Sequence, residues 1–345
     1  PRPRRDFHTA ASTRRSQASL SPTTARLQAM NSRQGLGQHS KIVADTGDLD
    51  SIKQLQPVDA TTNPSLILAA VNDPKFADLV DKAIKSAKGD TLDDRVTDAT
   101  ERLAVAFGVE ITKLVPGYVS TEVDARLSFD VKATIAKAHK IIALYEEHGV
   151  TKDRILIKIA STWEGIKAGE ELEKQGITCN MTLLFNFYQA VACAHSKVRL
   201  ISPFVGRILD FYKAKEGRDF EPEEDPGVLS VRKIFDYYKK HGHETIVMGA
   251  SFRSVGEVLA LAGCDRLTIS PALLKKMDEM SDAVPLKLDA ADAKTKDIPA
   301  VEMSESIFRW QMNQDAMATE KLADGIRKFA ADLDKLEEIV RSKMT

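Results

Sequence analysis

The stretch DRILIKIASTWEGI, residues 153–166, contains the feature that decides the fold. It opens with an apolar run typical of a parallel strand that is covered on both faces, and one lysine, Lys158, interrupts that run. Side chains alternate along a strand, so Leu156, Lys158 and Ala160 share one face while the isoleucines share the other. The lysine therefore points either into a barrel or toward the helices around it, and water reaches neither place.

Two explanations of Lys158 stay open from this pattern alone. A buried amine without a charge partner is costly, and enzymes use such amines as nucleophiles toward carbonyl groups. Alternatively, the side chain extends to the strand end or pairs with a carboxylate, as structural lysines in sheets do. Lys158 is therefore a candidate nucleophile whose surroundings must decide its role.

Seven further runs of this kind lie along the chain, separated by longer stretches with helical periodicity. Such alternation predicts βα units and a mostly parallel sheet. The expected strands span residues 41–45, 58–63, 120–124, 154–160, 177–184, 198–204, 244–251 and 266–271. Eight strands with intervening helices favour a closed α/β barrel of the (β/α)8 TIM type. The alternative is an open doubly wound sheet, but no G-x-G-x-x-G turn or Walker A loop follows the first strand.

Helices are expected at residues 132–149 and 230–242, because each stretch ends at a glycine suited to a left-handed cap. An additional C-terminal helix is expected within residues 317–343, where apolar residues alternate at spacings of four and three. This apolar stripe consists of Leu322, Ile326, Phe329, Leu333, Leu336 and Val340. It predicts packing on the barrel wall, and the sharper alternative is a homodimer contact through the same region.

Composition excludes several classes of protein. The 345 residues include 49 basic and 50 acidic side chains, so no bulk positive field exists to attract nucleic acid or an anionic membrane. No apolar run approaches the roughly 18 residues of a membrane span. The three cysteines are an odd number without CxxC spacing, which argues against disulfides and favours a reducing, cytoplasmic location. His241 and His243 lack a second ligand pair, so no metal site is expected.

The first 40 residues differ from the rest of the chain. They are rich in Arg, Ser and Thr and contain one acid, Asp6, so we expect a disordered extension. It is either an organelle transit peptide or, as we favour, a segment ahead of a true start at Met30. Residues 41–345 are expected to form a single barrel domain.

Polar side chains follow several of the expected strands. They are Asp45, Thr61, Asn63, Glu122, Asp124, Asn180, Thr182 and Ser202. Each one alone is usually a cap or turn residue, but the carboxyl ends of barrel strands are where catalytic groups gather. Arg207 and Arg253, with Ser251, lie near late strands and suit a phosphate, or else pair with Asp210 and Glu257.

At these residues the sequence resembles the transaldolases. The resemblance spans nearly everything from Ile42 to Lys343, through the blocks VADTGD, DATTNPSLIL, LVPGYVSTEVDARLSFD, DRILIKIASTWEGI, ITCNMTLLF, LISPFVGRILD, ETIVMGASFR and AGCDRLTISPALL. It implies a class I aldolase barrel of the pentose phosphate pathway. Such an enzyme transfers a dihydroxyacetone unit from sedoheptulose 7-phosphate to glyceraldehyde 3-phosphate, giving erythrose 4-phosphate and fructose 6-phosphate. Sugar phosphates are the implied partners, and no cofactor is implied.

The resemblance also implies roles for single residues. Lys158 resembles the Schiff-base lysine, and Asp45 resembles the carboxylate that moves the substrate hydroxyl proton. Glu122 and Thr182 resemble the pair that holds a catalytic water. The implied substrate-binding residues are Thr61, Asn63, Asn180, Ser202 and Phe204, and the implied phosphate-binding residues are Arg207, Ser251 and Arg253. Fructose 6-phosphate aldolases, the nearest rivals, tend to carry tyrosine at the position of Phe204.

The family usually has a short amphipathic helix before the first strand. Here the segment SRQGLGQHS has two glycines and little apolar periodicity, which argues against that helix.

Overall fold

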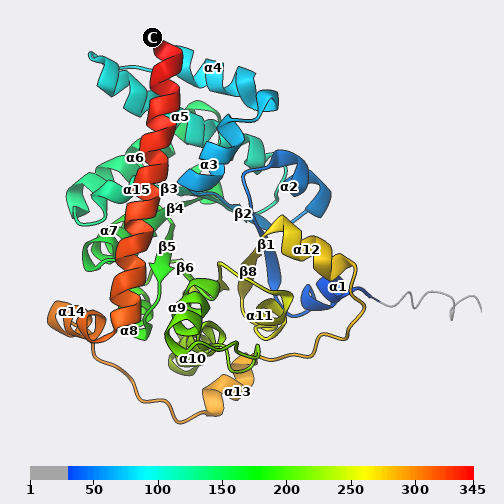
Figure 1. Cartoon of the computed structure of the whole chain (residues 1–345). Coiled ribbons are helices and arrows are strands. Elements are labelled where there is room, and N and C mark those ends of the chain that lie inside the picture. Colours follow the sequence, from blue (N-terminus) through cyan, green and yellow to red (C-terminus); the bar gives the residue numbers. More distant parts are fainter. Residues whose placement is uncertain (1–29) are drawn as a thin grey trace, which may run out of the picture.

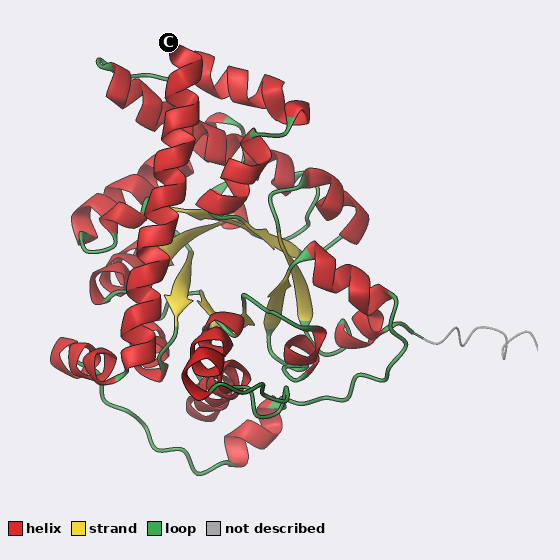
Figure 2. Ribbon diagram, viewed as in Figure 1, coloured by secondary structure: helices red, strands yellow, loops and turns green. Residues whose placement is uncertain are grey.

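All eight expected strands form, and they close into a parallel barrel in sequence order (Figure 2). The computed structural model describes residues 30–345. The strands are β1 Lys41–Asp45, β2 Asp59–Thr61, β3 Val119–Glu122, β4 Ile155–Ala160, β5 Cys179–Leu184, β6 Leu200–Pro203, β7 Ile246–Gly249 and β8 Arg266–Ile269. β8 returns to β1, with Ile42 paired to Leu267. The TIM barrel is therefore confirmed, and the open sheet is excluded.

Most strands are shorter than expected, and β2 shows why. Only Asp59–Thr61 of the expected residues 58–63 is strand, because the chain turns at once into helix α3, Pro64–Val71. Asn63 caps that helix by accepting a hydrogen bond from the backbone N–H of Leu66 at 3.0 Å. Pro64 suits the first helical position, where a backbone N–H has no partner to lose.

The helices surround the ring of strands (Figures 1 and 2). The remaining helices are α1 Ser32–Leu36, α2 Leu49–Leu55, α4 Ala77–Lys85, α5 Leu92–Thr112, α6 Val131–Glu147, α7 Trp163–Lys174, α8 Phe187–His195, α9 Gly206–Glu216, α10 Pro226–His241, α11 Val255–Leu259, α12 Pro271–Asp278, α13 Ala290–Thr295, α14 Glu305–Gln314 and α15 Ala316–Met344, with short 3-10 turns η2 Pro74–Phe76, η3 Ala125–Leu127 and η4 Lys152–Arg154. The two expected glycine caps are confirmed, because Gly149 and Gly242 have φ values of 74° and 69°.

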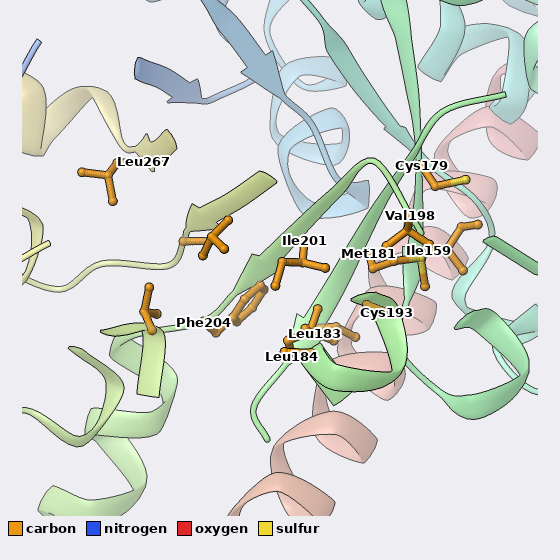
Figure 3. Close-up of a cluster of buried hydrophobic side chains, with 14 of the residues drawn as sticks. Ile159, Cys179, Met181, Leu183, Leu184, Cys193, Val198, Ile201, Phe204 and Leu267 are labelled. Carbon is orange, nitrogen blue, oxygen red and sulfur yellow. The ribbon is translucent and has the colours of Figure 1, made fainter. Parts of the chain in front are cut away.

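The two faces of β4 bury different layers. Ile155, Ile157 and Ile159 belong to the large core between sheet and helices, where each buried side chain contributes about 1.5–3 kcal/mol. Figure 3 shows part of that core around Met181 and Ile201. Leu156 instead joins a small cluster in the barrel interior. Because side chains alternate along a strand, Lys158 shares the face of Leu156 and points into the barrel.

The folded unit begins before β1, which corrects the expected boundary at residue 40. Asn31 caps α1, a short helix that the glycines of this segment were expected to prevent. Leu36 is completely buried, and the backbone N–H of Ser32 donates to the carbonyl of Met280 at 2.8 Å. Burial of one leucine and this long-range bond offset the low helix propensity of glycine. The first 29 residues of the extension expected over residues 1–40 lie outside the described residues.

Helix α15 runs across the barrel from α14 toward α4 (Figure 1). Its apolar stripe packs on this same chain, since Phe329, Leu336 and Val340 are almost completely buried. Gly325 allows the close approach, because a Cβ there would lie 2.7 Å from Cδ2 of Leu183 in β5. Packing on the barrel is therefore confirmed as the function of the stripe.

Candidate active site

Lys158 lies near the end of the barrel at which the strands finish, here called the carboxyl mouth. Its Nζ is 3.2 Å from Glu122 Oε2, and both side chains are nearly inaccessible to solvent. The two residues face each other because Glu122 and Lys158 are register partners on β3 and β4. Nζ also donates a hydrogen bond to the carbonyl oxygen of Thr62 at 3.2 Å. The alternative in which this lysine pairs with a carboxylate is therefore observed in the structure.

This ion pair does not prevent a nucleophilic role. Burial is the largest influence on Glu122 and raises the pKa of its carboxyl group, against the opposing attraction of the Lys158 charge. A carboxyl group with a raised pKa can accept a proton from its partner, leaving a neutral amine and a neutral acid. A neutral amine is the form that attacks a carbonyl.

Asp45 is the second carboxyl group at this mouth. Burial raises its pKa, while the charge of Lys158, a hydrogen bond from Thr61 and the charge of Arg207 act to lower it. Thr61 Oγ1 donates to Asp45 Oδ1 at 3.1 Å, and the Thr268 hydroxyl lies 2.9 Å from Thr61. Asp45 is thus held in place by a side chain that favours its ionised form.

Nine of the twelve predicted site residues line one cavity of about 80 Å³ at the carboxyl mouth. They are Asp45, Thr61, Asn63, Lys158, Thr182, Ser202, Phe204, Arg207 and Ser251, and Ala250, Thr268 and Phe329 complete the lining. Glu122 contacts this group through Lys158. Residues from seven strands or their ends therefore line this cavity, and Glu122 adds the eighth, β3, where the TIM fold gathers catalytic groups.

Asn180 is fixed in the barrel interior by two hydrogen bonds. Its Nδ2 donates to Ser120 Oγ at 3.0 Å, and its Oδ1 accepts from Ser202 Oγ at 2.6 Å. Thr182 Oγ1 is buried without a hydrogen-bond partner among residues 30–345, and the buried Glu122 Oε2 has only its ion pair with Lys158. Buried polar atoms are rarely left unpaired, so these two oxygens suit a bound water or substrate.

Arg207 is the second residue of α9, and its guanidinium group lies 5.1 Å from the Phe204 ring centroid. Its Nη1 is buried without a hydrogen-bond partner among the described residues. A buried guanidinium with a donor to spare is suited to an oxyanion. The alternative pairing of Arg207 with Asp210 is not observed as an ion pair in this part of the chain.

Arg253 behaves differently from Arg207. It forms the ion pair with Asp210 that was the alternative explanation, at 2.7 Å. Glu257 accepts hydrogen bonds from the backbone of residues 253 and 254 rather than from the Arg253 side chain. Ser251, between β7 and Arg253, adopts a left-handed conformation with φ of 63°. Arg253 thus lies at the rim and must exchange its partner to bind a ligand.

Comparison with known proteins decides the family. Residues 42–340 match the family described as Transaldolase/Fructose-6-phosphate aldolase. The chain belongs to this family. A transaldolase of Shewanella amazonensis is 58% identical over 316 residues, which cover 91% of this chain and 99% of that protein. A transaldolase of Alteromonas mediterranea is 60% identical over 307 residues, covering 88% of this chain and 96% of that protein.

A third relative, transaldolase A of Pasteurella multocida, is 60% identical over 306 residues, covering 88% of this chain and 96% of that protein. The family resemblance, the barrel and the class of enzyme expected from the sequence are thereby confirmed. Between residues 30 and 345, no helix is long and apolar enough to cross a membrane. The same residues contain no group of three or more side chains arranged to hold a metal ion.

Three residues at this candidate site were missed by sequence reasoning. The ring centroid of Phe329, on α15, lies 5.7 Å from Lys158 Nζ, although the apolar stripe to which Phe329 belongs indicated only packing. Thr268 supports Thr61, and Ser120 supports Asn180. Alternation along β8 and β3 could have placed the threonine and the serine in the barrel. No local signal could have placed Phe329 above the lysine.

Proposed function

We propose that this chain transfers a dihydroxyacetone unit from sedoheptulose 7-phosphate to glyceraldehyde 3-phosphate through a Schiff base on Lys158. The products are erythrose 4-phosphate and fructose 6-phosphate. The observation that carries the proposal is the buried pair of Lys158 and Glu122, in a cavity that also contains Asp45 and the partnerless Nη1 of Arg207. Membership in the family supports the same reaction.

The first step joins enzyme and ketose. The neutral Lys158 amine attacks the ketone carbon, and the resulting carbinolamine loses water to give the Schiff base. The proton that leaves the nitrogen and the proton that converts the hydroxyl to water both need a carrier. Glu122 lies within 3.2 Å of the amine, and a water between Glu122 and Thr182 would complete this proton path.

The second step breaks a carbon–carbon bond. Ionised Asp45 removes the proton of the donor hydroxyl next to that bond, and the bonding electrons move into the Schiff base to form an enamine. Erythrose 4-phosphate leaves as the aldehyde. The enamine then attacks the aldehyde carbon of glyceraldehyde 3-phosphate, Asp45 returns its proton, and water hydrolyses the new Schiff base to release fructose 6-phosphate.

The remaining polar residues are proposed to hold the substrate. Asn180 and Ser202 are prearranged by their mutual hydrogen bond and suit the hydroxyls of the retained three-carbon unit, together with Thr61 and Asn63. Phe204 has no hydroxyl with which to orient water. Because no hydroxyl at residue 204 directs water to the enamine, the enamine persists until an aldehyde binds. This favours transfer over release of free dihydroxyacetone, the reaction of a fructose 6-phosphate aldolase.

Arg207, Ser251 and Arg253 are proposed to bind the substrate phosphate. Arg207 supplies the buried donor, and the loop after β7 lies directly against the start of α9. Gly206 makes this contact possible, because a Cβ there would lie 2.5 Å from the carbonyl oxygen of Ser251. The phosphate would thus bind between a helix N-terminus and two arginines, a favourable environment for an anion.

The test follows both products of the reaction. Purified protein with fructose 6-phosphate and erythrose 4-phosphate should form sedoheptulose 7-phosphate and glyceraldehyde 3-phosphate in equal amounts. Borohydride should trap a covalent adduct with fructose 6-phosphate in the native chain, and the Lys158→Ala protein should form none. Free dihydroxyacetone without sedoheptulose 7-phosphate would assign the aldolase reaction, and absence of both would favour a binding protein.

We further propose a cytoplasmic homodimer that associates through the C-terminal helices. Trp310 on α14 is 58% exposed and lies next to α15 in the chain, which supports a contact surface there. The three cysteines are buried and free, which supports a reducing compartment. Analytical ultracentrifugation should give twice the chain mass, and Trp310→Glu should shift the equilibrium toward the monomer. A monomer in the native protein would contradict the dimer.

A further inference from the structure

The end of the barrel opposite Lys158, where the strands begin, is here called the amino mouth. It contains a cavity of about 690 Å³. We propose that this cavity binds a small molecule that carries two phosphate groups, at Lys41, Arg199 and Arg266. This site is separate from the proposed transfer reaction and does not depend on it.

The starts of several strands border the cavity. Lys41, Ile246 and Arg266 are the first residues of β1, β7 and β8, and Arg199 immediately precedes β6. Parallel strands all begin at the same end of a barrel, so these four residues face a common space. Lys41 shares its face of β1 with Val43, a member of the interior cluster, which directs it toward the mouth rather than the helices.

Positive charge is concentrated around this cavity. Its lining contains five Lys or Arg side chains, namely Arg33, Lys41, Arg199, Lys239 and Arg266, but only two carboxylates, Glu244 and Asp265. The whole chain has nearly equal numbers of both signs. A concave surface lined by one sign of charge raises the local concentration of the opposite ion.

Some of this charge is already neutralised, and the rest is available. Lys239 pairs with Asp265 at 2.7 Å, and Arg33 pairs with Asp278 at 3.0 Å. Lys41 and Arg199 are exposed, and neither forms an ion pair within residues 30–345. These two side chains can therefore bind an anion without giving up another partner.

Arg266 is the observation that points to a ligand rather than to a solvated surface. It is only 5% exposed, and its Nε lies 2.9 Å from Asp59 Oδ2. Its Nη1 is buried without a hydrogen-bond partner among the described residues. An unpaired buried donor on a charged group is unfavourable, and an oxyanion that enters the cavity lined by Arg266 would supply the missing acceptor.

The spacing of the two available cations favours two phosphate groups. β7 and β8 separate β6 from β1, so Arg199 and Lys41 are three strand spacings apart, each about 4.8 Å. At that separation each side chain can contact its own phosphate group, so the two side chains need not converge on a single one. A diphosphate or a small bisphosphate can contact both cations and still reach Arg266.

The test uses inorganic pyrophosphate and the full chain with Arg207→Ala and Arg253→Ala, which removes the proposed phosphate site at the other mouth. Isothermal titration calorimetry should show one binding site. Adding Lys41→Gln and Arg199→Gln should weaken that binding by about tenfold or more, because each change removes a charge-assisted contact. The matched control, Lys85→Gln with Lys132→Gln, removes two exposed charges outside the cavity and should leave the affinity unchanged.

Three results would overturn the proposal. The first is no pyrophosphate binding in the chain that lacks both active-site arginines. The second is an equal loss of affinity in the control, which would assign the effect to net charge. The third is orthophosphate binding as tightly as pyrophosphate, which would exclude the requirement for two phosphate groups.

Discussion

The two mouths of this barrel each contain one buried ion pair, and the two pairs differ in the chemistry that their cations allow. Lys158 and Glu122 lie 3.2 Å apart at the carboxyl mouth, and Arg266 and Asp59 lie 2.9 Å apart at the amino mouth. All four side chains are almost inaccessible to solvent. An ammonium group can give up its proton and become a nucleophile, whereas a guanidinium group cannot in a protein. The choice of cation therefore separates a reactive pair from a structural one.

The acids of the two pairs also differ in how well they are satisfied. Asp59 has a partner at each oxygen, since Oδ1 accepts from the backbone N–H of Tyr118 at 2.7 Å and Oδ2 faces Arg266. Glu122 Oε2 has only its ion pair with Lys158. Both carboxylate oxygens of the amino-mouth pair are therefore satisfied, whereas the carboxylate of the carboxyl-mouth pair keeps capacity to bind a water or a substrate.

The largest effect is expected from Lys158→Arg, which keeps the charge but removes the nucleophile. Transfer activity should fall on the order of 10⁴-fold, because a guanidinium forms no Schiff base. Coupled assay of sedoheptulose 7-phosphate formation measures this loss, and circular dichroism checks the fold. The control at the amino mouth is Arg266→Lys, which should stay within about threefold of native activity. Comparable activity losses in both variants would contradict the division between the two pairs.

Arg266→Ala tests whether the amino-mouth pair is structural. Removing one partner leaves the Asp59 carboxylate buried without its counter-ion, so unfolding in urea should become easier by about 3–5 kcal/mol. Activity per folded molecule should stay unchanged. The double variant Asp59→Leu with Arg266→Met should recover most of this stability, since an apolar pair needs no desolvated charge. A double variant no more stable than Arg266→Ala would mean that the site requires the charges.

Arg207→Ala sharpens the comparison by removing the available donor at the carboxyl mouth. We expect KM for the sugar phosphates to rise about 100-fold with a smaller change in kcat, because a charge-assisted contact to phosphate contributes 1.5–3 kcal/mol. Steady-state kinetics with both substrates measure the split. Arg199→Ala, at the amino mouth, is the matched arginine and should leave both constants near native values. A fall in kcat alone would contradict a binding role.

Thr61→Val should give the smallest effect, visible mainly in the pH profile. Burial raises the pKa of Asp45 above 3.8, and the Thr61 hydrogen bond acts against that rise. The reaction needs ionised Asp45, so kcat/KM should increase with pH through the raised pKa. Removing the hydroxyl donor raises this pKa further, and the acid limb should move to higher pH. Thr61→Ser keeps the donor and is the control. Identical acid limbs in all three proteins would exclude Asp45 as the titrating base.

Much of the fold and most of the site follow from local patterns in the sequence. Eight apolar runs predicted eight strands in the right order, and alternation placed Lys158 on the same face as Leu156. The strands and their ends indicated eight of the residues that line one cavity, and the family resemblance added Phe204. These predictions succeed because alternation and strand ends act over a few residues and a parallel barrel gathers all carboxyl ends together.

Other features needed contacts between distant parts of the chain. Phe329 faces Lys158 because Gly325 lets α15 approach β5, a fit that involves two segments far apart in the sequence. α1 forms despite its glycines because it packs against α12 and the segment around Met280, which are far away in the sequence. Arg253 pairs with Asp210 whereas Arg207 does not, although both arginines follow strand ends.

The sequence by itself indicated the barrel, its strand order and the face that Lys158 shares with Leu156, because side-chain alternation and turn residues are properties of short segments. It left open whether that face points into the barrel or toward the helices. Only the tertiary structure decided what that lysine meets. The closed barrel brings Glu122 to its amine and α15 to its other side, and it pairs Arg266 with Asp59 at the opposite mouth. Burial and partner choice are properties of the whole packed chain, since they depend on which groups exclude water around each charge.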